Sequence, residues 1–78
     1  PQINDQLARR LVDTIRNIRD LDLKKKPCIS ETLDWAQSLL ALQVEDLSPE
    51  IVNDTLNVIC KYRADAGQVV EKMEKILN

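Results

Sequence analysis

The residues best suited to chemistry are three consecutive lysines, Lys24, Lys25 and Lys26, and two cysteines, Cys28 and Cys60. The chain has no histidine and no Cys-x-x-Cys pair, so a zinc site would lack its usual ligands. No nucleophile with a matching base and no glycine-rich phosphate loop can be picked out. We therefore predict no catalytic residue and no metal site, and we interpret both cysteines as reduced packing residues.

The lysines lie directly before a helix start. Pro27 disfavours helical structure at the residue before it, and Ser30 can accept hydrogen bonds from first-turn amides, so we predict that a helix begins at about Ser30. Ammonium groups beside free amides attract anions, although Glu31 in the same turn would repel them. The alternative is that the lysines solubilise the loop and balance Asp20 and Asp22.

Apolar residues recur every three to four positions, and the chain contains one glycine and three prolines. This pattern predicts an all-α fold, a compact bundle of about four helices that forms one domain over residues 1–78. The buried stripes expected from this spacing are Leu7, Ala8, Leu11, Val12, Ile15 and Ile18 in the first helix, Val52, Leu56 and Ile59 in the third, and Val69, Val70, Met73, Ile76 and Leu77 in the fourth.

Capping residues place the other helix starts. A fusion of the last two helices through Arg63 and Ala64 is an alternative. The predicted caps are Asn4 or Asp5 for the first helix, Ser48 followed by Pro49 for the third, and Asp65, at capping-box spacing from Gln68, for the fourth.

Charge and composition bear on partners and location. The net charge is −2, acids and bases are interspersed, and the chain has two aromatic residues, so we expect no nucleic-acid partner. Arg9, Arg10, Arg16 and Arg19 fall outside the apolar stripe of the first helix, and we interpret them as a solvated polar face. DNA binding by these arginines is a weaker alternative. The sequence has no membrane-length apolar run and no signal-peptide core, so we expect no membrane contact and a cytoplasmic domain of a longer protein.

Two strings, KKPCISETLDWAQSLLAL and VEDLSPEIVNDTLNVICKYRAD, carry a family resemblance. Together they resemble the C-terminal helical lid of MoxR-type AAA+ ATPases, in particular the branch associated with maturation of molybdenum-containing carbon monoxide dehydrogenase. The resemblance extends from about Leu7 to Asp65. It implies that residues 1–78 are the lid of a larger ATPase whose phosphate-binding residues lie upstream.

The resemblance also implies a function and partners. Such a lid covers the nucleotide site and couples ATP binding and hydrolysis to subunit packing in a chaperone-like remodelling or metal-centre maturation machine. The implied partners are the upstream P-loop subdomain, neighbouring subunits of a ring and a client protein. ATP and Mg²⁺ would be cofactors of the parent protein, and we expect this chain alone to bind neither and to hydrolyse no ATP.

The lid of many MoxR proteins begins its second helix with Ser-Pro-Arg, whose arginine reaches the nucleotide phosphates. This sequence has Cys28, Ile29 and Ser30 at the matching positions, or Glu31 at the last of them if the alignment shifts by one. Neither Ser30 nor Glu31 supplies a fixed positive charge, so direct phosphate sensing is not expected here. The candidate nucleotide-proximal residues are Lys25, Lys26, Ser30 and Glu31.

The second helix is apolar on two sides, one with Leu33, Ala36 and Leu40 and the other with Trp35, Leu39 and Leu42. Trp35 is either a core anchor or, with Leu39 and Leu42, a docking surface for the ATPase subdomain or the next subunit. A free-standing helical module that binds a partner helix beside Trp35 is the alternative function.

Overall fold

All regular structure in residues 4–77, the part of the chain that the computed structural model describes, is helical. The helices are α1 (Asp5–Arg19), α2 (Ile29–Ala41), α3 (Pro49–Ile59), α4 (Arg63–Glu71) and α5 (Met73–Leu77). The predicted all-α bundle is confirmed, with one helix more than the four expected. The additional helix arises because the predicted last helix is interrupted at Lys72, which ends α4 with a φ of −103° and a ψ of 24°.

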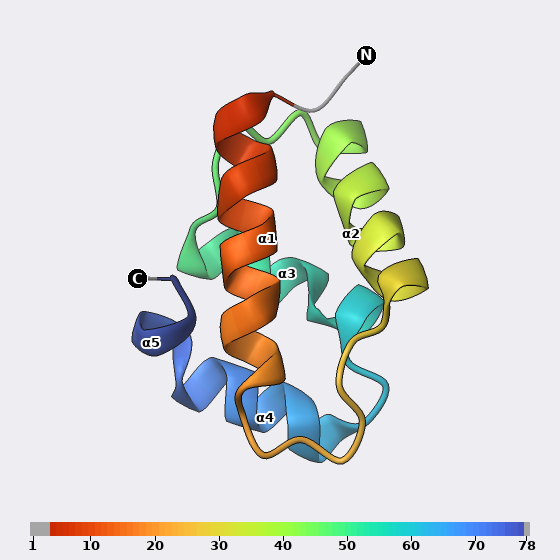
Figure 1. The fold of residues 1–78 in the computed structure, drawn as a ribbon, viewed down its shortest axis with the longest axis vertical. Helices are drawn as coiled ribbons and strands as arrows, with labels where there is room; N and C mark the ends of the chain where they lie inside the picture. The colour runs from red at the N-terminus through yellow and green to blue at the C-terminus, as the bar shows by residue number, and fades with distance from the viewer. Residues whose placement is uncertain (1–3, 78) are drawn as a thin grey trace.

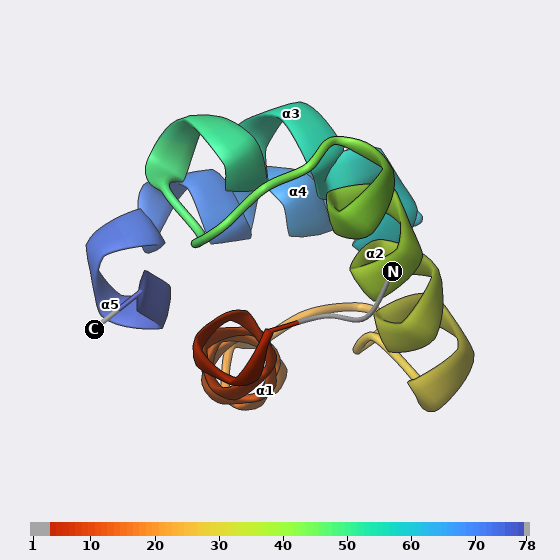
Figure 2. The same ribbon diagram turned by 90° about the horizontal axis from the view of Figure 1, so that it is seen from above.

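The helices form an arc around α1, which runs along the long axis of the molecule (Figure 1). Figure 2, viewed nearly down α1, shows α5 at one end of the arc, α2 at the other, and α3 and α4 between them. α1 packs most extensively on α5, and α2 packs on α3, whereas α1 and α2 make few contacts. α1 is therefore held mainly by α5 and more lightly by α2.

Two helix starts follow the predicted capping pattern. Asn4 precedes α1, and its Oδ1 accepts a hydrogen bond from the Leu7 amide at 2.7 Å. Ser48 precedes α3, where its Oγ accepts from the Ile51 amide at 3.3 Å and Pro49 occupies the first helical position. Both caps satisfy amides that have no partner inside the helix, so local sequence is sufficient to fix these starts.

The predicted start of α2 at about Ser30 is confirmed, but the expected cap, Ser30, is wrong. The helix begins at Ile29 and its N-cap is Cys28, whose extended backbone is typical of an N-cap residue. Glu31 Oε1 accepts a hydrogen bond from the Cys28 amide at 3.0 Å. The glutamate therefore caps the helix end, and Ser30 lies exposed in the first turn.

The predicted cap of the last helix is also wrong. α4 begins at Arg63 after Tyr62, and Asp65 lies inside its first turn with 2% of its surface exposed. α3 and α4 are not fused, because Cys60 has an extended backbone with a φ of −118° and a ψ of 120°. The Asp65 carboxylate accepts hydrogen bonds from a distant loop, as described below.

The core includes most of the predicted stripes. Val12 and Val70 are exceptions at 51% and 47% exposure, so both were wrongly predicted as buried. Ala8, Met73 and Leu77 are partly buried. The buried apolar residues are Leu7, Leu11, Ile15, Ile18, Leu21, Leu23, Trp35, Leu39, Leu47, Val52, Leu56, Ile59, Val69 and Ile76.

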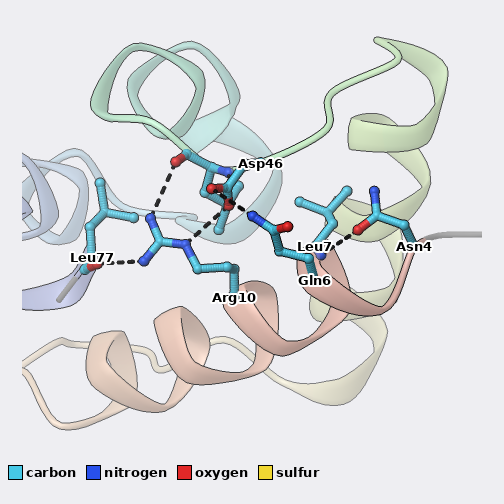
Figure 3. A network of polar contacts seen from close by, with 7 residues as sticks. Asn4, Gln6, Leu7, Arg10, Asp46 and Leu77 are labelled. Atoms are coloured by element: carbon cyan, nitrogen blue, oxygen red, sulfur yellow. Dashed lines mark hydrogen bonds and ion pairs between the residues drawn. The ribbon is translucent and has the colours of Figure 1, made fainter.

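Arg10 joins three separate segments of the chain (Figure 3). Its guanidinium donates to the carbonyl oxygens of Leu77 at 2.6 Å and Leu47 at 3.3 Å, and it pairs with Asp46 Oδ1 at 3.1 Å. The Leu47 amide and Arg10 together hold the pKa of Asp46 below its usual value. Arg10 therefore fastens the C-terminal helix and the α2–α3 loop to α1, rather than facing water as expected from sequence.

Within residues 4–77, no helix is both long enough and apolar enough to cross a membrane.

Candidate functional site

The lysine loop, Lys24 to Lys26, is the first predicted site, and its side chains contact groups of the same chain. Lys25 Nζ lies 3.5 Å from Glu31 Oε2. Lys26 Nζ donates to the carbonyl oxygens of Arg19 and, at 3.2 Å, Leu21. Lys26 thus satisfies carbonyl groups at the C-terminal end of α1, where a positive charge is favourable.

The backbone amides of the same loop are also occupied. The Asp65 carboxylate accepts from the Lys24 amide at 2.8 Å and from the Lys25 amide at 3.0 Å. The Lys24 ammonium lies 5.9 Å from the centre of the Tyr62 ring, within the range of a cation–π contact. An internal carboxylate thus fills the position that a bound anion would take, so the loop has a structural role.

Ser30 and Glu31, the other two predicted nucleotide-proximal residues, lie at the start of α2. Glu31 accepts from the Cys28 amide, and this hydrogen bond is the main reason that its pKa is lowered. Its negative charge is thereby favoured beside the loop. The structure brings Lys25 and Glu31 together as a pair, whereas the Lys26 ammonium turns back to α1.

The predicted docking surface is wrong for two of its three residues. Trp35 and Leu39 have no exposed surface. The Trp35 indole Nε1 donates to Thr55 Oγ1 at 2.8 Å, and Thr55 in turn donates to the Ile51 carbonyl at 2.7 Å. Leu42 is 57% exposed, but the two buried side chains hold α2 on α3 and cannot contact a docked protein in this arrangement.

A hollow lies between α1 and the N-terminal half of α2. We call it the α1–α2 groove, and its volume is about 630 Å³, within the range of sites that hold small molecules or parts of a partner. Its lining residues are Val12, Ile15, Arg16, Arg19, Pro27, Cys28, Ile29, Ser30, Thr32 and Leu33.

Three apolar side chains of this groove are exposed. Ile29 has 80% of its surface exposed, Leu33 59% and Val12 51%. Ile29 and Leu33 are four residues apart on α2, so they lie one above the other on the same face. Sequence reasoning missed Ile29 and Val12 as surface residues. The four-residue spacing of Ile29 and Leu33 was a signal that could have identified Ile29, but it says nothing about Val12 on α1.

The groove has one basic wall and one neutral wall. Arg16 and Arg19 come from α1, and Arg19 also donates to the Pro27 carbonyl. The α2 wall contributes aliphatic and hydroxyl side chains, and no lining residue is acidic. Such a surface can bind apolar groups with negative charge beside them, and its lining includes no pair of residues suited to acid–base catalysis.

The two thiols differ in environment. Cys28 lines the groove and is exposed, whereas Cys60 is partly buried at the C-terminal end of α3. Burial, with the nearby negative charges of Asp65 and Glu31 as smaller contributions, raises the pKa of Cys60 to about 11. Residues 4–77 contain no cluster of three or more His, Cys, Asp or Glu side chains that could hold a metal ion.

No protein-family model, no curated protein and no solved structure matches this chain.

Proposed function

We propose that the chain is the C-terminal lid of a MoxR-type AAA+ ATPase. In this role it covers the nucleotide site and couples ATP binding and hydrolysis to subunit packing in a remodelling or metal-centre maturation machine. The observation that carries the proposal is the position of segment 28–30. The resemblance sets these residues at the nucleotide, and they line the groove that carries the exposed Ile29.

The proposed lid acts through apolar contact. Ile29, Leu33 and Val12 are free to pack against the ATPase subdomain, and fully burying one such side chain contributes about 1.5–3 kcal/mol. The groove therefore replaces the predicted surface of Trp35 and Leu39 as the docking face. Neither Ser30 nor Glu31 supplies a fixed positive charge to a phosphate, so closure rather than phosphate sensing is the contribution of α2.

A lid that transmits force has to move as one body, and internal links support this role. Arg10 ties α1 to Leu47 and Leu77, and Asp65 ties α4 to the loop between α1 and α2. These bonds join elements that are distant in sequence, so contact at the groove can move these elements together as a rigid body. ATP and Mg²⁺ would bind upstream, in a cytoplasmic ring whose subunits and client are the remaining partners.

The test is the ATPase rate of the full-length protein beside a version that ends before Pro1. We expect deletion to lower turnover and ring assembly. Leu33→Ser in the full-length protein should lower turnover in the same direction, whereas Val70→Ser, an exposed apolar residue of α4, should leave it unchanged. Unchanged turnover in both the deletion and Leu33→Ser would overturn the proposal, as would a gene with no Walker sequence upstream.

A second candidate function is a free-standing interaction module that binds a partner helix. It is favoured by the exposed Ile29 and Leu33, which share one face of α2 and could contact a partner helix. The two functions differ in the effect of the upstream sequence. A module keeps its partner affinity when expressed alone and has no effect on ATP turnover.

A further inference from the structure

We infer that the α1–α2 groove binds an amphipathic protein helix whose apolar side is flanked by carboxylates. The inference deepens the proposed function and rests on it for the identity of the partner, since under that function the helix belongs to the ATPase subdomain on which the lid docks. The chemistry of the occupant is argued from the two walls of the groove alone.

The shape of the groove favours a helix. α1 and α2 run in opposite directions on its two sides (Figure 1), so a third helix can lie between them with its side chains in the gap. The exposed apolar groups are Ile29 and Leu33 on one wall and Val12 on the other, above the buried Pro27. Apolar residues at i, i+3 or i+4, and i+7 of a partner helix fit such a set of anchors.

The charge of the α1 wall favours carboxylates on one flank of that helix. Arg9, Val12, Arg16 and Arg19 have spacings of three, four and three residues, so they share one face of α1. Asp5 lies on this face two helical turns before Val12, and Asp13 lies at its edge, four residues after Arg9 and three before Arg16. The exposed Arg9 and Arg16 make no ion pair within the described residues, so their charge is available to a partner.

The α2 wall sets the orientation of the partner. Its groove residues carry no charge, and Glu31 beside them is paired with Lys25. A helix with carboxylates on the α1 side thus finds complementary charge, whereas the same helix turned around places them against Ile29 and Leu33. Complementary charges of this kind select the partner and its direction more than they add affinity.

The experiment uses the 78-residue chain labelled with ¹⁵N and three stapled helical peptides, so that failure to bind cannot come from an unfolded peptide. The first peptide has leucines at i, i+4 and i+7 with glutamates along one flank. The second has lysines in place of those glutamates, and the third has serines in place of the leucines.

We expect the glutamate peptide to bind at least about tenfold more tightly than the lysine peptide, and the serine peptide not to bind. Shifted amide signals should include Val12, Arg16, Ile29 and Leu33. Arg16→Glu should remove or reverse the preference between the two charged peptides. Lys75→Glu is the matched control, because Lys75 is also a basic residue in the last turn of its helix and α5 lies on the far side of α1 (Figure 2).

Equal affinity for the glutamate and lysine peptides, binding of neither, or signal changes away from the groove would overturn the inference. A dimer of the free chain that is lost in Leu33→Ser would make a second copy the occupant and would also overturn it. If the chain prefers the glutamate peptide but neither the deletion nor Leu33→Ser changes ATP turnover, only the proposed function is rejected. An effect of Leu33→Ser on turnover without charge preference would reject only the inference.

Discussion

The Asp65 carboxylate should be among the most important polar groups for stability. It is 2% exposed and accepts two backbone hydrogen bonds, at 2.8 and 3.0 Å, from a loop some forty residues earlier in the chain. Asp65→Asn keeps the shape of the side chain, but its amide group can accept only one of these bonds. The other backbone amide then faces a donor and remains unsatisfied.

The size of the effect follows from these bonds. A hydrogen bond to a charged group contributes about 1.5–3 kcal/mol, and a buried polar group left without a partner costs about 1–3 kcal/mol. We therefore expect Asp65→Asn to lose about 3 kcal/mol, which corresponds to a fall of about 12–24 °C in Tm for a domain of this size. The net stability expected of such a small domain is only about 3–5 kcal/mol.

Thermal unfolding followed by circular dichroism at 222 nm measures this loss. The control is Asp54→Asn, which changes an exposed aspartate of α3 in the same way and should move Tm by little. A second variant, Asp65→Ala, tests the assignment directly, since added formate should raise its Tm more than that of the wild type by restoring a carboxylate. If Asp65→Asn were as stable as Asp54→Asn, the two bonds would contribute nothing and the structural role of the lysine loop would be refuted.

Three further predictions concern α2 and the thiols. Gln43 has a φ of 59° in the turn after α2, so Gln43→Gly should raise the free energy of unfolding by about 1 kcal/mol in urea titration, and an unchanged midpoint would contradict this. The pKa of Glu31 is lowered by folding, so its contribution to stability is present above the ordinary value of 4.5 and is lost as the pH falls through the folded value. Glu31→Gln should therefore reduce the fall of Tm below about pH 4.5, and the remaining fall should include the part due to Asp46. At pH 8 a maleimide should modify exposed Cys28 much faster than Cys60, as peptide mass spectrometry will show, and equal rates would contradict the buried position of Cys60.

Helix existence could be predicted from sequence because the signals are local. The 3.6-residue spacing of apolar side chains and the caps at Asn4 and Ser48 depend only on neighbouring residues, and both caps form as expected. The break between α4 and α5 at Lys72 has no such local signal, since neither Lys72 nor the residue on either side of it is glycine or proline. The number of helices was therefore underestimated by one.

Contacts between distant residues could not be predicted from local signals. Asp65 has the spacing of a helix cap, but its carboxylate gains two amides from the loop at Lys24 and Lys25 instead. Arg10 looked like part of a solvated face, yet the ends of two other segments lie within its reach. In both cases the same side chain can satisfy either a local or a distant partner, and the tertiary fold decides which.

The two apolar sides of α2 show most clearly what the sequence left open. Periodicity identified both sides, and the candidate docking surface was assigned to the one that contains Trp35. That side instead forms the core contact with α3, where Thr55 accepts the indole hydrogen bond. An indole carries a donor that must be satisfied when buried, and the threonine placed to accept it could be recognised only after α3 was in position.

The other side of α2 then requires an explanation that the fold does not provide. Ile29 and Leu33 are 80% and 59% exposed, so most of their apolar surface contributes nothing to folding and raises the risk of aggregation. The same exposed positions could be polar at no cost to the core, because the neighbouring Trp35 and Leu39 already close it. The proposed contact with another surface would explain why these apolar residues lie beside Arg16, which makes no ion pair within residues 4–77, and the Leu33→Ser and Arg16→Glu variants separate the apolar from the charged part of that contact.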